Sequence, residues 1–535
     1  MLISLLVTVV FGVLYFYVKL PALNMHSPDF YLFVYLLCIV YCGCNIFVTG
    51  YKASGVKEYF KHLLKKCTVP VVVAAAFLAI SAIGGLAGSV IFRAKTYAEL
   101  LPMQEGDFSK EVKELKWDQI PMLDADSANT LANKKMGELS DLVSQFEVDG
   151  ASAQINYQDR PVRATYLNYG GLIKWFNNRS EGIPAYLLID MVTQEVSVQR
   201  LEEGMKYSPS EPLNRNIDRY LRFHYPTKMF YDVNFEVDDE GVPYWCATTV
   251  TNTIGLFGGT DVTGAVLVNA VTGESRFYEI GDVPSWVDRV CSADLILQQY
   301  DYYGMYQGGF WNSVLGQSGC TKTTTGYNYI AMDDDVWVYT GITSVGGDES
   351  NLGFILVNQR TKEARYYACA GANEQAGMNS AQGAVQQYSY QATFPILLNI
   401  GNEPTYFMAL KDASQLVKMY AMVNVSQYQI VATGTTVEEC QENYMQQLVK
   451  SGIAEEEKAP EVKTSEVTGR VAEMRSAVMD GDTYYFIRLA EQPVYYLVNG
   501  REYPVATILN IEDMVTIQYE DGDGEILTGV SLERK

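Results

Sequence analysis

The chain of 535 residues is 48% hydrophobic and 19% charged, a balance that excludes an intrinsically disordered protein. Residues 1–93 contain seven Lys or Arg and two acidic residues, whereas the whole chain has a net charge of −23, so residues 94–535 carry −28. A domain this acidic repels a phosphate backbone, which excludes nucleic acid as its partner.

Three apolar stretches near the beginning of the chain, residues 2–20, 30–48 and 69–92, predict transmembrane helices. Each is close to the roughly 20 residues that a helix needs to cross about 30 Å of hydrocarbon. A cleaved signal peptide is the alternative for the first stretch. That stretch has no basic segment in front of it and no small-x-small site after Pro21. We therefore interpret residues 1–93 as a membrane block with three transmembrane helices.

The orientation of the block follows from the loop at residues 51–67, which contains five lysines. Such a cluster is typical of the cytoplasmic side of a membrane. We expect a multi-pass cell-membrane protein with a cytoplasmic N-terminus and with residues 94–535 outside the cytoplasm. Small residues also recur in the third stretch, at Ser81, Gly85 and Ser89 and at Gly84 and Gly88. This spacing is typical of close backbone packing, with a flexible patch as the alternative.

One short pattern recurs in the outer domain: an apolar run, then Asp or Asn, then Thr three residues later and Glu five residues later. It occurs at residues 187–195, 266–274 and 355–363, and in a degenerate form at 421–429. Asp and Asn bond nearby backbone groups in turns, and Gly273 permits a positive φ. We interpret the pattern as a hairpin turn between two strands; a ligand site is the alternative.

A second pattern, rich in aromatic residues, precedes each copy of the first at residues 145–148, 222–225, 299–302 and 387–390. Upstream of the first copy, apolar residues from Met136 to Phe146 recur at helical spacing. Each unit therefore reads as a helix followed by antiparallel strands. We expect an α+β fold with a juxtamembrane segment at 94–130 and about four tandem units at 131–213, 214–292, 293–377 and 378–452.

The run Leu-Val-Asn-Ala-Val-Thr-Gly-Glu-Ser at residues 267–275 resembles the hairpin signature of PepSY-like modules, which are small α+β domains of bacterial envelope proteins. The resemblance covers the hairpin and the helix–strand order of each unit. It implies a membrane-anchored tandem repeat array that binds partner proteins or regulates peptidases. It implies no functional residues.

The last part of the chain is expected to form a small OB-like β-barrel at residues 466–535, after a charged linker at 453–465. Five strand-like runs fall within about seventy residues, as is typical of such barrels. The barrel sequence has an acidic excess, which favours a protein or a glycan over an oligonucleotide as its ligand.

No catalytic, cofactor-binding or metal-binding residues are predicted. Only three histidines are present, and His224, the one in the outer domain, lies inside a repeated motif. The acidic runs at 333–335 and 520–525 carry carboxylates of the kind that bind Ca²⁺, but neither completes an EF-hand loop and both are expected to be turns. The odd number and irregular spacing of the outer domain's cysteines do not indicate a disulfide framework, with one or two bridges of undetermined pairing as the alternative. These cysteines are Cys246, Cys291, Cys320, Cys369 and Cys440.

Aromatic residues are dense in one stretch, which we predict as a candidate interaction surface. Packing inside the protein is the alternative for these side chains. The stretch comprises Tyr300, Tyr302, Tyr303, Tyr306, Phe310 and Trp311.

These features favour a non-enzymatic, membrane-anchored envelope protein whose outer units bind other proteins as a scaffold, a sensor or a peptidase regulator. Its partners would be envelope or membrane proteins, or cell-wall glycan. A glycan-binding protein is the second hypothesis, based on the aromatic stretch. A hydrolase that uses two carboxylates is the third, because acidic residues distant in sequence can meet in space.

Overall fold

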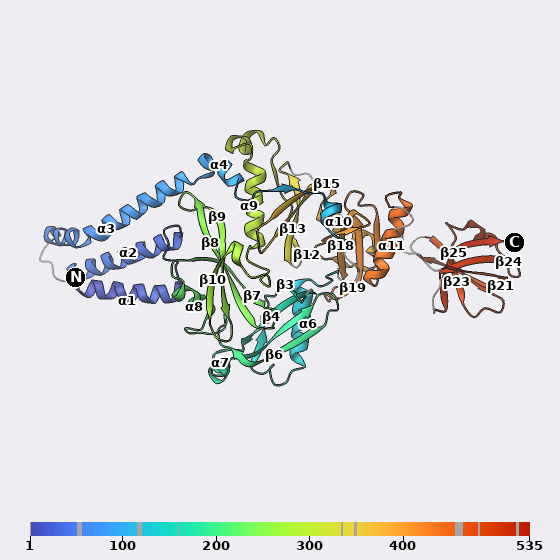
Figure 1. The fold of residues 1–535 in the computed structure, drawn as a ribbon, viewed down its shortest axis with the longest axis horizontal. Coiled ribbons are helices and arrows are strands. Elements are labelled where there is room, and N and C mark those ends of the chain that lie inside the picture. Colours follow the sequence, from blue (N-terminus) through green and yellow to red (C-terminus); the bar gives the residue numbers. More distant parts are fainter. Residues whose placement is uncertain are drawn as a thin grey trace. The chain divides into compact units, whose positions relative to one another are not determined.

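The computed structural model describes residues 2–50, 56–114, 120–158, 160–332, 335–346, 350–454, 464–479, 482–520 and 524–535. The chain divides into two compact units, Met1–Ser451 and Gly452–Lys535. It is a mixed α+β protein (Figure 1), as the sequence predicts.

Three long apolar helices begin the first unit: α1 (Leu2–Lys19), α2 (Pro28–Gly50) and α3 (Val56–Ala87). Stretches of 18, 20 and 24 residues within them are long and apolar enough to cross a membrane, which confirms the three predicted apolar helices. The third helix ends at Ala87 rather than at residue 92. Residues 90–92 begin a separate helix, α4 (Val90–Ala98).

The break between α3 and α4 lies at a contact between glycines. A Cβ on Gly88 would lie 2.6 Å from the carbonyl oxygen of Ile254, and a Cβ on Gly255 would lie 2.4 Å from Cα of Gly88. One turn earlier, Leu256 packs against Gly84 and donates its N–H to the Gly84 carbonyl oxygen. The small residues of the third stretch thus form a packing seam. Its partner is the tip of a β-hairpin of the outer part of the unit.

Four sheets follow, and strands within each are antiparallel to their neighbours except where β1 joins the third sheet. The first sheet contains β2 (Phe146–Val148), β3 (Ala153–Tyr157), β4 (Arg160–Tyr169), β5 (Ile183–Asp190) and β6 (Val196–Met205). The second contains β7 (Met229–Val237), β8 (Pro243–Ile254), β9 (Gly258–Asn269) and β10 (Ser275–Glu279). The third contains β11 (Thr321–Thr323), β12 (Asn328–Met332), β13 (Asp335–Ser344), β14 (Ser350–Asn358) and β15 (Ala364–Ala372). The fourth contains β16 (Gln391–Ala392), β17 (Ile396–Ile400), β18 (Glu403–Lys411), β19 (Val417–Asn424) and β20 (Val431–Gly434).

A helix precedes each sheet in the chain. These helices are α6 (Ala125–Gly137), α8 (Ile217–His224), α9 (Ala293–Tyr306) and α10 (Glu374–Ala384), with α7 (Leu172–Asn178) inserted in the first sheet and α11 (Val437–Lys450) after the fourth. The helix predicted from Met136 to Phe146 is wrong in its extent, because α6 ends at Gly137. Beyond Gly137 the apolar residues lie in successive turns. In one of them the N–H of Phe146 donates to the Leu142 carbonyl oxygen.

The recurring Asp/Asn-x-x-Thr-x-Glu pattern forms the same turn three times. The side-chain oxygen of Asp190 accepts the N–H groups of the residues two and three positions later at 2.9 and 2.8 Å, and Asn269 and Asn358 do the same at 2.9 Å each. Gly273 has φ +79° there. The predicted hairpin turn is therefore confirmed. The degenerate copy at Asn424 caps a different turn, since its side chain accepts from Gln427 N–H.

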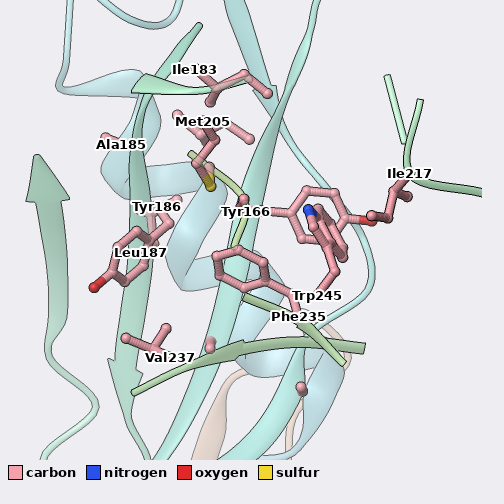
Figure 2. Close-up of a cluster of buried hydrophobic side chains, with 14 of the residues drawn as sticks. Tyr166, Ile183, Ala185, Tyr186, Leu187, Met205, Ile217, Phe235, Val237 and Trp245 are labelled. Atoms are coloured by element: carbon pink, nitrogen blue, oxygen red, sulfur yellow. The ribbon is translucent and has the colours of Figure 1, made fainter. Parts of the chain in front are cut away.

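Neighbouring sheets share their hydrophobic cores. In Figure 2 the rings of Tyr166, Phe235 and Trp245 lie together between the first and second sheets, with centroids of Tyr166 and Trp245 4.8 Å apart. A second core cluster joins Cys246 of the second sheet to Ile296 of α9 and Val338 of the third sheet. These shared cores account for the first unit being compact. The boundaries predicted between four separate units stay predictions.

The juxtamembrane segment forms a strap across the third and fourth sheets. Its strand β1 (Gln104–Glu105) pairs in parallel with β15, and α5 (Phe108–Glu111) follows. Beyond α5, the Val112 carbonyl oxygen accepts from Asn399 of the fourth sheet at 2.7 Å, and Asp124 forms an ion pair with Lys411.

The second unit is a closed five-stranded barrel in the order β21-β22-β23-β25-β24. Buried Val471, Ile487, Val498 and Ile517 contribute to its own core. All five predicted strands are confirmed: β21 (Thr464–Met479), β22 (Asp482–Leu489), β23 (Tyr495–Asn499), β24 (Met514–Glu520) and β25 (Ile526–Arg534).

Candidate functional site

The aromatic stretch predicted as an interaction surface is divided between the core and the surface. Tyr300 is 2% exposed, and burial raises the pKa of its hydroxyl. Tyr302 and Tyr306, both half-buried, pack against Tyr97 of α4 with ring centroids 4.9 and 6.5 Å away. Tyr303 is half-buried beside Tyr300. Tyr302 and Tyr306 therefore hold α4 against α9.

Trp311, at the end of the stretch, is 69% exposed. Half-buried Phe310 supports it, with the two ring centroids 5.4 Å apart. Val314 and Leu315, which follow in the π-helical turn η3 (Asn312–Gly316), are 55% and 77% exposed. We name Trp311, Val314 and Leu315 the Trp311 patch.

The Trp311 patch is held on an ordered turn. The side-chain amide of Asn312 donates to the Ser318 carbonyl oxygen at 2.9 Å, and its backbone carbonyl accepts from Gln317 N–H at 2.6 Å. The buried Cys320 thiol donates to the Met305 carbonyl oxygen and so ties this turn to the end of α9. An apolar patch on a fixed turn loses little conformational entropy when a partner covers it.

A larger feature lies where the apolar helices meet the second sheet's helix α8. A groove of about 810 Å³, which we name the interface groove, is within the roughly 300–1,000 Å³ of typical ligand pockets. Its walls are mainly apolar and aromatic. The lining residues are Thr8, Val9, Gly12, Val13, Phe16 and Tyr17 of α1, Phe33 and Leu37 of α2, and Tyr207, Asn214, Arg215, Arg219, Tyr220, Phe223 and His224.

Two arginines stand at the end of the interface groove near Tyr17. The guanidinium of Arg219 lies 4.2 Å from the centroid of the Tyr17 ring and donates to the carbonyl oxygens of Tyr17, Pro212 and Leu213. Within the part of the chain that the structure describes, no carboxylate forms an ion pair with Arg219. Arg215 is paired with Glu211 at 3.0 Å.

Burial affects the acidic groups at this end of the groove. It raises the pKa of Glu211 and of Asp218, although Arg215 and Arg219 act in the opposite direction. The segment 212–228 nevertheless contains four Arg or Lys and one acidic residue, in a domain whose net charge is −28. This segment therefore carries a local net positive charge.

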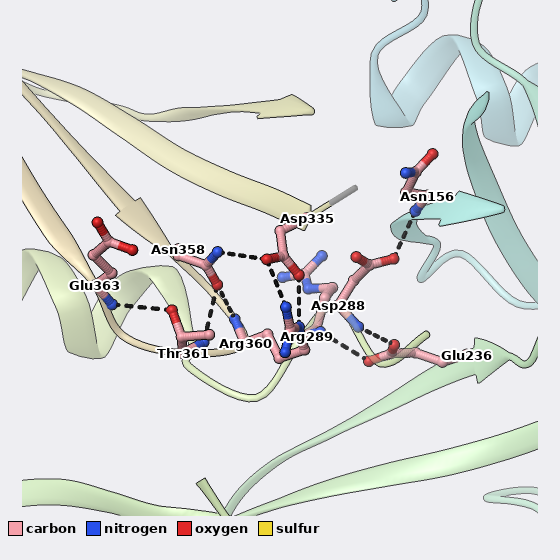
Figure 3. A network of polar contacts seen from close by, with 9 residues as sticks. All are labelled: Asn156, Glu236, Asp288, Arg289, Asp335, Asn358, Arg360, Thr361 and Glu363. Carbon is pink, nitrogen blue, oxygen red and sulfur yellow. Dashed lines mark hydrogen bonds and ion pairs between the residues drawn. The ribbon is translucent and has the colours of Figure 1, made fainter. Parts of the chain in front are cut away.

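A buried polar network joins the first three sheets (Figure 3). Glu236 of β7 is fully buried and accepts the N–H groups of Asp288 and Arg289 at 2.7 and 3.1 Å. Asp288 accepts from the N–H of Asn156 in β3 at 2.6 Å, and Arg289 donates to the hydroxyl of Tyr329 in β12. Burial raises the pKa of Glu236 to about 7, against the opposing effects of these N–H groups and of Arg289.

Glu236 and Asp288 are the two buried carboxylic acids of this network, and two carboxylates are what the hydrolase hypothesis requires. They are 0% and 1% exposed, so a substrate cannot reach either group in this structure. The network therefore acts as an internal connection between sheets.

The acidic turns form no metal centre in the described residues, where no group of three His, Cys, Asp or Glu side chains is placed to bind a metal ion. Asp335 is bound by both Nε and Nη2 of Arg360, at 2.6 and 2.8 Å, and by Asn358 (Figure 3). Residues 333, 334 and 521–523 of the two acidic runs lie outside the described residues.

His224 and the cysteines pack against or bond to other parts of the fold. His224 closes α8, with its ring stacked on Tyr220 at 3.9 Å and Nδ1 2.8 Å from the Tyr220 carbonyl oxygen. All nine cysteines are free thiols, and Cys246, Cys291 and Cys440 are buried with raised pKa values because of burial.

Sequence reasoning missed Val314, Leu315 and the interface groove. Val314 and Leu315 come three and four residues after Trp311, so their exposure could have been suspected from their position between glycines 309 and 316. The basic segment 212–228 was also readable as a local charge excess. The groove itself depends on contacts between residues about 200 positions apart, for which a single sequence carries no signal.

The structure thus defines a mixed α+β chain with three helices able to cross a membrane and a closed barrel near its end. No protein-family model and no curated protein matches it. Among solved structures, a mutant levansucrase of B. megaterium is matched at 8% identity over 83% of this chain and 94% of that chain, with a TM-score of 0.16. A TM-score this low reflects no common fold.

Proposed function

We propose that this chain is a non-enzymatic, membrane-anchored protein that binds other proteins outside the cytoplasm. The observation that carries the proposal is the Trp311 patch. Trp is the residue type most enriched at the energetic centres of protein interfaces, and here it stands exposed beside two exposed aliphatic side chains on a fixed turn.

The orientation is part of this proposal. The lysine-rich loop at residues 51–67 supports a cytoplasmic N-terminus and an extracytoplasmic position for residues 94–535.

The proposal also includes tandem PepSY-like units and an OB-like barrel. Three identical hairpin turns, each in a sheet that follows a helix, support tandem PepSY-like units that diverged from one ancestor. For the barrel, the parallel pairing of β23 with β25 and the sharing of β21 between β22 and β24 support an OB-like topology.

The test places a photo-crosslinking amino acid at residue 315 of the full-length protein in intact cells. We expect one discrete protein adduct, identified by mass spectrometry, that disappears when Trp311→Ala is added. Leu416 provides a matched control position, because it is a 48% exposed leucine in the turn between β18 and β19.

Identical adducts from residues 315 and 416 would refute the proposed patch. Adducts with wall glycan alone would replace the proposal by the glycan-binding function, since an exposed Trp also stacks on sugars. A Trp311→Ala protein that keeps the adduct in full would show that the tryptophan does not contribute to binding.

A further inference from the structure

The interface groove has the length of half a bilayer. From Thr8 to Tyr17 the α1 wall spans nine residues, or roughly 14 Å at 1.5 Å per residue. The α2 wall reaches Leu37, nine residues from the helix start at Pro28. Half of a hydrocarbon core of about 30 Å is roughly 15 Å. The groove therefore matches half of the hydrocarbon core in length.

Both walls of its deep end belong to helices that are able to span a membrane. The deep end is apolar, with Val9, Val13 and Leu37. In a bilayer this part of the groove opens to acyl chains rather than to water. An apolar, elongated cavity in that place suits a hydrocarbon chain.

The shallow end of the groove has different chemistry. Arg215 and Arg219 stand there beside Tyr17, at the last turn of α1. Guanidinium groups bind phosphate by forked hydrogen bonds, and Arg219 has no carboxylate partner among the described ion pairs. The net positive segment 212–228 surrounds this end.

We propose that the interface groove binds one anionic glycerophospholipid from the leaflet next to the sheets. One acyl chain lies along α1 and α2, and the phosphate lies at Arg219, with Arg215, which is paired with Glu211, also lining this end. This inference rests on the membrane block and is independent of the protein-binding proposal. It holds for either orientation of the chain.

The proposed lipid site lies at the junction between α8 and the end of α1. Arg219 bonds the end of α1 through the Tyr17 carbonyl oxygen, and Arg222 of α8 bonds the Leu20 carbonyl oxygen at 2.9 Å. A lipid phosphate at Arg219 adds an anion to this junction, so the bound lipid is expected to stabilise α8 on α1.

The experiment uses the full-length protein in detergent, delipidated and titrated with dioleoyl phosphatidylglycerol or dioleoyl phosphatidylcholine. Native mass spectrometry measures the bound lipid, and the melting temperature gives a second readout. We expect one bound phosphatidylglycerol with an apparent affinity at least tenfold above that of phosphatidylcholine.

Two pairs of variants separate the groove from general lipid contact. Val13→Trp fills the groove, and Val10→Trp places the same side chain on an exposed face of α1 that does not line it. We expect at least a tenfold loss of lipid affinity for V13W and none for V10W. Arg219→Gln should remove most of the preference for phosphatidylglycerol, whereas Arg200→Gln, at an exposed ion pair of β6, should keep it.

Equal lipid binding by V13W and V10W would show annular lipid only and overturn the proposal. Equal affinity for the two lipids in the unaltered protein would overturn the anionic headgroup. If V13W fails to fold, Leu37→Trp fills the groove from the α2 wall, and unchanged lipid binding by that variant would overturn the proposal as well.

Discussion

At the scale of single residues, Glu236 is a buried acid whose protonation makes the stability of the fold depend on pH. Its pKa is raised from 4.5 to about 7 by burial, so the folded protein binds more protons than the unfolded chain between these pH values. The free energy of unfolding therefore falls as pH rises through this window, and the loss is complete above the folded pKa.

We predict that the melting temperature of the full-length protein falls between pH 5 and pH 8, and that Glu236→Gln flattens this fall. Glutamine keeps one acceptor for the N–H groups of Asp288 and Arg289 but carries no charge. Thermal denaturation at several pH values measures the difference between the two slopes. Parallel slopes would contradict the role assigned to Glu236.

The hairpin turns give a second prediction at this scale. Asn269→Ala removes the acceptor of two N–H groups, each at 2.9 Å, and should lower the free energy of unfolding by about 1–2 kcal/mol. Asn269→Asp is the control, because Asp190 holds the same position in the first sheet. Denaturant unfolding of both variants measures the effect, and an equal loss in both would refute the turn as its cause.

These turns also show how far a sequence can be interpreted. Asp190, Asn269 and Asn358 were predictable because a turn depends on residues that are close in the chain. Tyr300 and Trp311 belong to one aromatic stretch, yet one is 2% and the other 69% exposed. Composition alone does not distinguish them, because Tyr300 of α9 packs into the core shared with the third sheet, whereas Trp311 lies beyond the end of α9.

At the scale of elements, the contact between α3 and the β8–β9 hairpin is the most sensitive junction. A Cβ on Gly88 would lie 2.6 Å from the Ile254 carbonyl oxygen, whereas a Cβ on Gly85 would meet only a side-chain atom of Phe257 at 3.9 Å. The two glycines are less than one helical turn apart. Gly88 touches backbone atoms of the hairpin, whereas Gly85 does not.

We predict that Gly88→Ala destabilises the full-length protein by about 1–3 kcal/mol, because backbone atoms must separate to admit the methyl group. Gly85→Ala should have little effect. Thermal stability in detergent and protease cleavage at the hairpin measure both variants. The same response in both would show that the glycine contact is not what holds the hairpin.

The strands of the barrel and the three apolar helices were predictable from periodicity and length. The sequence predicts that the helix α6 continues to Phe146, since Leu139, Leu142 and Val143 keep helical spacing. It ends at Gly137 in the structure, because Phe146 pairs with Tyr169 in the first sheet. A strand pairing of this kind depends on a partner more than twenty residues away.

At the scale of the whole molecule, the barrel has its own core and forms a separate compact unit. We predict that residues 453–535 fold alone and unfold in one cooperative transition. Ile487→Ala should lower the stability of this fragment by about 2–5 kcal/mol, because Ile487 is 0% exposed. Circular dichroism during thermal denaturation measures both properties. A fragment without a cooperative transition would contradict the independence of the barrel.

The strap formed by the juxtamembrane segment has a consequence for the order of synthesis. Asp124 and Val112 bond residues 287 positions later, Lys411 and Asn399. At about 5–20 residues per second, those partners emerge on the order of 15–60 s after the strap does. Phe108 of the strap, which is buried in the folded protein, packs on Tyr367 of the third sheet and has no such partner until that sheet is made. The last bonds of the strap, at Asn399 and Lys411, cannot form until the fourth sheet is made.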